Sequence, residues 1–258
     1  MKIYNFSPHE LLKSFIHSYK IIESEEIPLF NRILPGTALT LAFRFRGSTA
    51  YVSTQGNAVL PAATFSGLRK TARIINYMPH TSVLVILFKE TGASAFFKIP
   101  LQELFEESIS LEHLVHSPEV AAIEEILCEA STHNERILVI EEFLISRLMI
   151  FKPDPVVEAA LKKIYSSGGL IKMKTLAESI SLSQDAFEKR FRKVVGASPK
   201  QFASIARMKS IIEKKKKDHS ILDLSFDGGY FDAAHFHKEF KLFTGQTPAD
   251  FFKTIRYW

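Results

Sequence analysis

Amide, ammonium and guanidinium side chains fall on one face of the segment 184–195. Apolar residues at helical spacing, Phe187, Phe191 and Val194, mark the opposite face. The residues that face away from them are Gln184, Asp185, Glu188, Lys189 and Arg192. A glutamine amide can pair bidentately with adenine, and lysine or arginine can reach guanine or a phosphate. This set predicts a surface that binds double-stranded DNA.

A second segment, 233–244, repeats the apolar spacing with Phe236 and Phe240 but carries a different outer face. Its outward residues are Ala233, Ala234, His237, Lys238 and Lys241. The two alanines offer base edges only contact with a thymine methyl group. We therefore expect the first segment to carry more sequence discrimination than the second.

These two segments belong to an internal repeat. The stretch FEKRFRKVVGASPKQF at 187–202 recurs as FHKEFKLFTGQTPADF at 236–251, at a constant offset of 49 residues. Each copy follows a short apolar segment and a turn, with Ser183 as the helix cap in the first copy and Gly229 and Asp232 as turn and cap in the second. Both copies predict a helix-turn-helix unit, which places its second helix in the major groove of DNA.

The repeat resembles the paired helix-turn-helix units of the AraC family of bacterial transcription regulators over residues 176–202 and 224–252. The residues that carry this resemblance are the run Gly229-Tyr230-Phe231-Asp232, then His235-Phe236, Phe240-Lys241, Gly245 and Thr247-Pro248. The resemblance implies a DNA-binding regulator, more often an activator, with RNA polymerase as a partner. Gly228 departs from it, because the family has an aliphatic residue there, and we expect a loss of core methyl groups and of about 1 kcal/mol of helix preference.

The segment from Pro199 to about Lys216 predicts a helix that links the two units. It would be ~27 Å long at 1.5 Å per residue, enough to set two recognition helices in successive major grooves about 34 Å apart. This predicts a non-palindromic site of roughly two helical turns. The resemblance implies that Arg207 supports the packing of this helix. The run 214–217, four lysines, either touches phosphate or is a solvated helix end.

The charge distribution separates the chain into two parts. From residue 153 to the end there are 19 Lys and Arg against 12 Asp and Glu, while residues 1–152 are slightly acidic. A basic part fused to a near-neutral part is expected where one of them meets phosphates. Pro153 and Pro155 interrupt the helical patterns, and Asp154 is a suitable cap for the helix that follows. We predict domains at 1–152 and 153–258.

The N-terminal part is rich in strand patterns. Apolar residues alternate with polar ones over 39–46, Val83 to Phe88 is a more buried strand, and helices are expected at 119–130 and 135–151. The stretches ILPGTALTLAFRF and LFKETGASAFFKIPLQEL resemble an N-terminal domain of unknown function attached to many AraC-like regulators, similar in outline to a cupin-like ligand domain. The predicted fold class is α+β, with a β-rich barrel or sandwich followed by an all-α domain.

The N-terminal domain is expected to serve as a sensor or a dimerisation domain. Arg44 and Arg46 fall on the same strand face, where they could meet an anionic small-molecule effector or form a solvated sheet surface. The stripe Ile137, Ile140 or Glu141, Leu144, Leu148 and Phe151 could form a homodimer seam or pack on the domain's own sheet.

No enzymatic motif is present in the sequence, and no catalytic residue, metal site or cofactor is predicted. There is no HExxH, GxSxG, Walker or GxGxxG pattern, and the histidines lack ligand spacing. Cys128 is the single cysteine, midway along a helical stripe, which favours a core position and a reducing compartment. No apolar run approaches the ~20 residues needed to cross a membrane, so we expect a cytoplasmic protein with no membrane partner.

The sequence therefore predicts a sequence-specific DNA-binding transcription regulator that receives a signal through its N-terminal domain. Two alternatives stay open at this point. One is an enzymatic domain fused to a DNA-binding domain, for which a cysteine-rich methyl-acceptor domain would need more than one cysteine. The other is a protein-interaction adaptor with no small-molecule ligand. The operator, the effector and the sign of regulation do not follow from the sequence.

Overall fold

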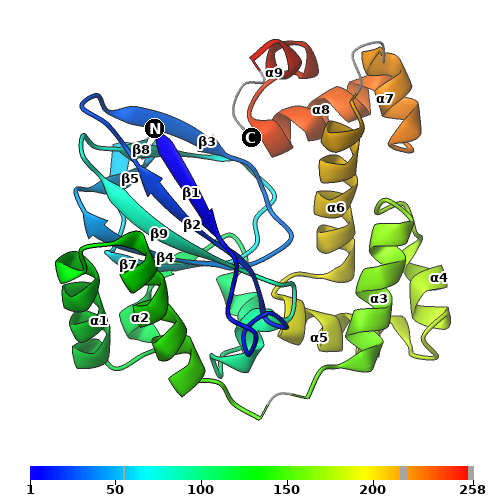
Figure 1. Cartoon of the computed structure of the whole chain (residues 1–258). Coiled ribbons are helices and arrows are strands. Elements are labelled where there is room, and N and C mark those ends of the chain that lie inside the picture. The colour runs from blue at the N-terminus through cyan, green and yellow to red at the C-terminus, as the bar shows by residue number, and fades with distance from the viewer. Residues whose placement is uncertain (55, 151, 216–219, 255–258) are drawn as a thin grey trace.

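The computed structural model describes residues 1–54, 56–150, 152–215 and 220–254, and it has a β-rich N-terminal part followed by a helical part (Figure 1). The predicted division near residue 152 lies between helices α2 (His133–Ser146) and α3 (Pro155–Ser166). No helix in the described ranges is long and apolar enough to cross a membrane.

Two antiparallel sheets form the N-terminal domain. The larger has the order β1 (Lys2–Phe6), β2 (Ile16–Glu23), β9 (Ser82–Phe88), β4 (Thr40–Arg46), β7 (Ala63–Ser66) and β10 (Ser108–Ser110). The smaller has the order β3 (Leu29–Ile33), β8 (Arg73–Tyr77), β5 (Thr49–Ser53) and β6 (Gly56–Val59). The predicted strands at 39–46 and 83–88 are therefore confirmed as the adjacent strands β4 and β9.

The main core of this domain lies on the outer face of the larger sheet. Helices α1 (Ser117–Glu129) and α2 cover that face (Figure 1), and Phe43 of β4 packs edge-on against Phe143 of α2. The stripe Ile137, Ile140 and Leu144 is buried there, so the dimer-seam alternative for it is wrong. The last residue of the stripe, Phe151, lies outside the described residues.

The opposite face of β4 turns toward the smaller sheet. Since side chains alternate along a strand, Thr40, Ala42 and Arg44 share that face. A small apolar cluster, centred on Ile22, Tyr77 and Val83, joins the two sheets there, and the hydroxyl of Tyr51 lies 2.9 Å from Oγ of Ser108 across them. The space between the sheets is consequently left open as a cavity.

Helix α2 ends earlier than the sequence pattern predicts. The expected helix ran to residue 151, but Arg147 is already the C-cap. The backbone N–H of Met149 donates to the carbonyl of Ala95 at 3.0 Å, a tertiary contact that directs the chain away from the helix axis. Periodicity within the segment carries no information about that contact.

The helical domain follows with α3, α4 (Met173–Glu178), α5 (Gln184–Val195), α6 (Pro199–Lys214), α7 (Ile221–Asp227), α8 (Ala233–Thr244) and α9 (Pro248–Thr254). Short 3-10 helices η1 (Gly92–Ala95), η2 (Leu101–Leu104) and η3 (Leu111–His113) join strands and helices in the N-terminal domain. Pairs α4–α5 and α7–α8 are the two predicted helix-turn-helix units, with α6 between them (Figure 1).

Candidate nucleic-acid interface and internal cavity

Helix α5 begins where the sequence predicts. The hydroxyl of Ser183 accepts the backbone N–H of Ala186, which satisfies a donor that the first helical turn leaves free. Phe187, Phe191 and Val195 are buried against the rest of the domain. Of the predicted contact residues on this helix, Gln184, Asp185 and Lys189 are exposed, and Glu188 and Arg192 are half-buried.

Helix α8 has the same construction. Asp232 accepts the backbone N–H of His235 at 2.7 Å, and Gly229 takes the left-handed conformation (φ +68°) that the preceding turn needs. Phe236 and Phe240 are buried. Of the predicted contact residues on this helix, Ala233 is half-buried. The others are exposed, namely Ala234, His237, Lys238 and Lys241.

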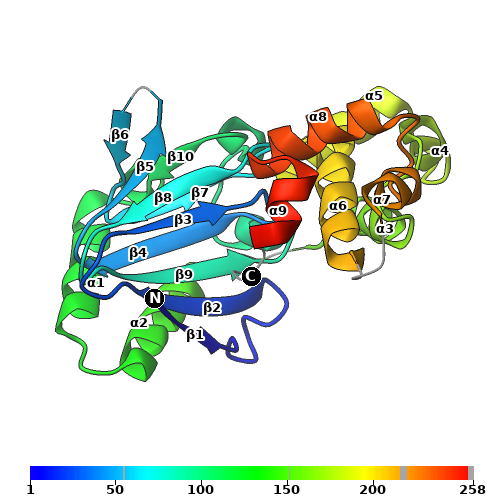
Figure 2. The ribbon, with the colours of Figure 1, turned by 90° about the horizontal axis from the view of Figure 1, so that it is seen from above.

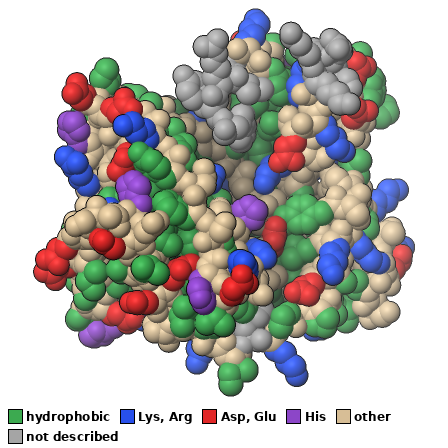
Figure 3. Space-filling view, viewed as in Figure 1, with side chains coloured by type: hydrophobic (Ala, Val, Ile, Leu, Met, Phe, Trp, Pro, Cys, Tyr) green, Lys and Arg blue, Asp and Glu red, His purple; other side chains and the backbone are tan. Residues whose placement is uncertain are grey.

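The two recognition helices stand at opposite ends of α6 and on the same side of it (Figures 1 and 2). Helix α6 has 16 residues, or about 24 Å at 1.5 Å per residue. The view of Figure 3 shows the other side of the molecule, where acidic and basic side chains are interspersed. Lys216 and Lys217 of the predicted lysine run lie outside the described residues.

Arg192 already has a partner on its own helix. Its Nε and Nη2 donate to Oε1 of Glu188 at 2.8 and 2.7 Å, one helical turn away. Both side chains are about 40% exposed, so water screens the pair. A base or phosphate must therefore compete with a carboxylate for this guanidinium group.

Replacing Glu188 with Gln is expected to tighten DNA binding by about tenfold, because it frees Arg192 and removes a negative charge that faces phosphate. The slope of log K against log salt should steepen by about 0.9 if Arg192 then gains a phosphate. A mobility-shift titration at several salt concentrations measures both quantities. Glu125→Gln, an exposed change on α1, is the control and should have no effect. Unchanged or weaker DNA binding by the Glu188→Gln variant would contradict the prediction that Glu188 competes with DNA for Arg192.

A polar network joins α6 to the second unit. Nη2 of Arg207 lies 2.7 Å from Oε2 of Glu239, which also accepts the hydroxyl of Tyr230 at 2.6 Å. The guanidinium group stacks on the Tyr230 ring at 4.2 Å. Burial and the bond to Glu239 raise the pKa of Tyr230. The supporting role that the resemblance implies for Arg207 agrees with these contacts, and His235 also contacts Glu239, at 3.4 Å.

Gly228 is a correction to the sequence interpretation. A Cβ at this position would lie 2.5 Å from Cδ1 of Ile211, so the space that an aliphatic side chain would take is already filled. The residue caps α7 with an ordinary φ of −76°. The expected loss of core packing is therefore compensated by α6.

A second tie holds α5 to α3. Asp154 accepts the backbone N–H groups of Val156 and Val157, which confirms it as the cap of α3, and also pairs with Nε of Arg190 at 2.5 Å. Burial would raise the pKa of Asp154, but the bond from Arg190 and the cap bonds together lower it. Arg190 is thereby occupied in packing, consistent with its absence from the predicted DNA-contact set.

The N-terminal domain contacts both recognition helices at their C-terminal ends. Gly196, which caps α5 with φ +85°, packs against Leu101 of η2, where its Cβ position is 3.0 Å from the Leu101 carbonyl oxygen. Nη1 of Arg32 in β3 donates to the carbonyl of Thr244, the last residue of α8, at 2.9 Å. A cation suits a helix C-terminus, where carbonyl groups are unpaired.

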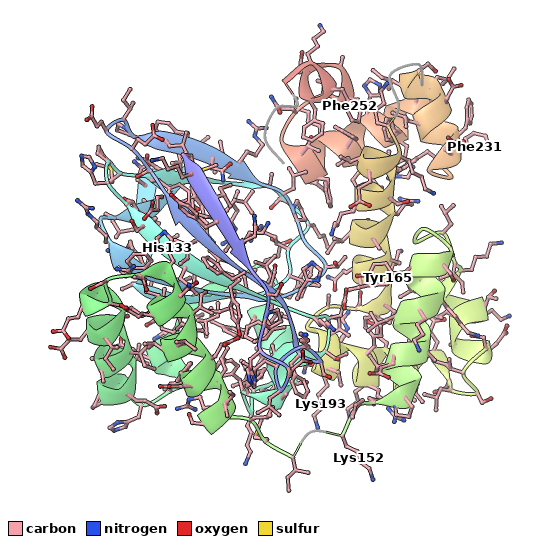
Figure 4. The ribbon with its side chains drawn as sticks, in the orientation of Figure 1. His133, Lys152, Tyr165, Lys193, Phe231 and Phe252 are labelled. Carbon is pink, nitrogen blue, oxygen red and sulfur yellow. The ribbon has the colours of Figure 1, made fainter. Side chains whose placement is uncertain are left out.

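The cavity between the sheets has a volume of about 1290 Å³ and reaches the linker helix. Lys209, Ile212 and Glu213 of α6 line it together with both sheets. Tyr165 of α3 also lines it, from the junction of the two domains (Figure 4), and donates a hydrogen bond to Glu90 after β9. An occupant would therefore touch both domains at once.

The two arginines considered as candidate effector ligands differ in their position relative to the cavity. Arg44 lines the cavity, but Arg46 is exposed and is not part of its wall. The pairing of β4 with β9 shifts register between these two residues, while buried Phe43 and Phe45 still alternate with Arg44 and Arg46. Sequence reasoning missed Tyr51 and Arg69, whose place in the cavity wall depends on sheet packing.

Cys128 is also a correction. The sequence favoured a core position, but the side chain is exposed and its Sγ donates to the carbonyl of Phe45 at 3.2 Å. The buried face of α1 carries Val120, Ile123 and Leu127, so the helical phase differs by one residue from the expected one. Across the described ranges no group of three or more His, Cys, Asp or Glu could hold a metal ion.

Comparisons with known proteins match both parts of the chain. Residues 176–254 match a helix-turn-helix domain family, and residues 4–110 match the domain of unknown function DUF6597. The Msm operon regulatory protein of Streptococcus mutans is 28% identical over 187 residues, which cover 70% of this chain and 64% of that protein. The chain thus spans slightly less than two thirds of this relative.

Two solved structures are similar to parts or most of this chain at low identity. ToxT from Vibrio cholerae is 11% identical, with a TM-score of 0.48 over 92% of this chain and 97% of that one. The C-terminal domain of AraT from Geobacillus stearothermophilus is 21% identical, with a TM-score of 0.38 over 42% of this chain and 91% of that one. The matches therefore give the chain an AraC-type helix-turn-helix domain at residues 176–254 and a DUF6597 domain at residues 4–110.

Proposed function

We propose that this protein is a sequence-specific regulator of transcription, acting as an activator, that responds to a small molecule held between its two sheets. The observation that carries the proposal is the position of α6. This one helix separates the two recognition helices and also forms part of the cavity wall through Lys209, Ile212 and Glu213. A molecule in the cavity that fits one arrangement of the two domains better than another would shift the population toward it.

Selection of bound sequences from a random DNA pool by the full chain tests this proposal. The expected product is a non-palindromic site of roughly two helical turns. Gln184→Ala should then relax the preference at one base pair of the first half-site, at a cost of about 1–3 kcal/mol against the selected base. Asn134→Ala, an exposed amide on α2, is the matched control. No enriched sequence, or no salt-dependent binding, would refute the proposal and favour the adaptor alternative.

The activating role adds RNA polymerase as a partner, and this rests on the family alone. A homodimer is a separate part of the proposal. Three apolar side chains on α1 and α2 are exposed: Ile126 at 48%, Leu138 at 57% and Ile145 at 37%. Scattered exposure of this kind is common, but these three are large apolar side chains on the two helices that cover the sheet.

Sedimentation of the full chain measures the predicted homodimer. We expect a concentration-dependent dimer whose dissociation constant rises when Leu138 becomes Asp, because the charge would be buried in an apolar contact. Glu142→Asp on the same helix is the control. A strict monomer at tens of micromolar would remove the homodimer from the proposal and leave DNA binding untouched.

A further inference from the structure

We propose that the cavity binds the anionic group of a small molecule, a carboxylate or a phosphate, at a site formed by Tyr51, Ser66 and Arg69, here called the anion pole. The proposal rests on the proposed function in treating the cavity as an effector site, and it adds the chemical class of the effector. All three residues line the cavity.

Hydroxyl groups from both sheets converge at the anion pole. The hydroxyl of Tyr51, on β5 of the smaller sheet, lies 2.9 Å from Oγ of Ser108. Oγ of Ser66, on β7 of the larger sheet, lies 2.8 Å from the same Ser108 oxygen. A hydroxyl can donate one hydrogen bond and accept others, so Tyr51 and Ser66 can redirect their protons toward a bound oxygen.

The charge at the anion pole is positive and incompletely compensated. Nε of Arg69 is enclosed and has no hydrogen-bond partner among the described residues. A second guanidinium group, Arg73, stacks on the Tyr51 ring at 4.8 Å. Arg73 donates to the backbone carbonyl of Glu106 and to Oγ of Ser108. The carboxylate of Glu106 acts on Arg69, and its Oε1 already accepts the backbone N–H of Lys70 at 2.7 Å. Arg73 is thus engaged locally, whereas Nε of Arg69 is left for a bound anion.

Titration directions agree with this geometry. Burial is the largest influence on Arg69 and lowers its pKa. Burial alone would raise the pKa of Tyr51, but the hydrogen bond with Ser108 and the charge of Arg69 outweigh it and lower that pKa. Both pKa directions are those expected for groups in a desolvated, electropositive site. An enclosed guanidinium nitrogen without a hydrogen-bond partner is costly, so a bound anion that accepted from Nε of Arg69 would stabilise this end of the cavity.

The rest of the wall is largely apolar and includes Ile33, Ile75, Val85 and Leu87. The volume exceeds the roughly 300–1,000 Å³ of common small-molecule sites. A ligand with an anionic group at one end and an apolar body fits this cavity, because the anion pole would hold the charged end and the apolar wall would cover the body. An inorganic anion alone would leave the apolar wall uncovered.

Arg44 is remote from the anion pole and serves as an internal control. Thr40 pairs with Ser66 in the β4–β7 ladder, whereas the backbone N–H of Arg44 donates to the carbonyl of Ala62. Arg44 is four residues beyond Thr40 on β4, so about 13 Å of strand separates it from the position opposite Ser66. Nη1 of Arg44 also donates to the carbonyl of Gly47, so this guanidinium group has a local partner.

Calorimetric titration of the full chain tests the proposal with three probes that share an apolar body. The probes are 4-phenylbutyrate, 3-phenylpropyl phosphate and the neutral 4-phenylbutyramide. We expect at least one acid to bind about tenfold or more tightly than the amide, because a charge-assisted bond to a buried guanidinium is lost in the amide. The preferred acid identifies the carboxylate or the phosphate as the natural group.

Variants locate the effect. Arg69→Gln should abolish the preference for the acid over the amide and leave the affinity for the amide unchanged. Arg69→Lys should retain most of that preference, and Arg44→Gln should retain all of it. Thermal unfolding verifies that each variant is folded. Equal affinity for acids and amide, binding of none of the probes, or an unchanged preference in the Arg69→Gln variant would each overturn the proposal.

DNA binding to the selected sequence is measured on the same preparations. Loss of acid binding with intact DNA binding refutes the anion pole alone. Acid binding by a chain that selects no DNA supports the anion pole and refutes the proposed regulator.

Discussion

Arg207→Ala is expected to lower the free energy of unfolding by about 2–3 kcal/mol and to shorten the DNA footprint to one half-site. The substitution removes the ion pair to Glu239 and the stacking on Tyr230, and these contacts hold α8 against α6. The Arg207 side chain is only 20% exposed, which limits screening by water. Glu239 would keep its bond from the Tyr230 hydroxyl, so the second unit should loosen rather than unfold by itself.

Urea unfolding of the full chain and nuclease protection on the selected site measure these two effects. Lys200→Ala, an exposed change on the same helix, is the control and should change neither. If the free energy of unfolding of the Arg207→Ala variant lies within about 0.5 kcal/mol of the parent value and both half-sites remain protected, apolar packing alone positions α8.

Gly67→Ala is expected to lower the free energy of unfolding by about 2–3 kcal/mol. It should also weaken DNA binding, although the residue lies in the N-terminal domain. A Cβ on Gly67 would lie 1.8 Å from the carbonyl oxygen of Leu104, so η2 must move. Leu101 of the same 3-10 helix supports Gly196 at the end of α5. Displacing η2 therefore removes the surface on which the first recognition helix rests.

Gly36→Ala is the matched control, because the nearest atom to its Cβ position is 4.0 Å away. Unfolding and DNA titration on the full chain separate two results. Lower stability with unchanged DNA affinity would mean that η2 supports the N-terminal domain but does not set the position of α5. Gly67 also directly follows Ser66, so the same variant measures whether the anion pole communicates with α5.

Local features of the helical domain followed from the sequence because they depend on neighbouring residues. Ser183 and Asp232 were predicted as caps, and both accept the expected backbone N–H groups. Gly229 was predicted at the turn, where the chain takes a positive φ. The repeated phenylalanines marked the buried faces of α5 and α8 through helical periodicity alone.

The partners of two long side chains were not predicted, for different reasons. Arg192 was assigned to DNA, yet it pairs with Glu188 one helical turn away, a local contact that helical spacing allows. Arg32 was not singled out, because its contact with Thr244 joins positions 212 residues apart. The sequence pattern contains no measure of such separations.

The sequence by itself determined the duplicated helix-turn-helix units, their caps and the strand-rich character of the N-terminal half, because each follows from periodicity and turn chemistry within short windows. Only the tertiary structure decided that β4 turns its apolar face to α1 and α2 and its polar face to a cavity. The cavity wall includes Arg44 but not Arg46, and sheet packing brought Tyr51, Ser66 and Arg69 together from separate segments. Those placements follow from register and layer packing, which no local pattern encodes.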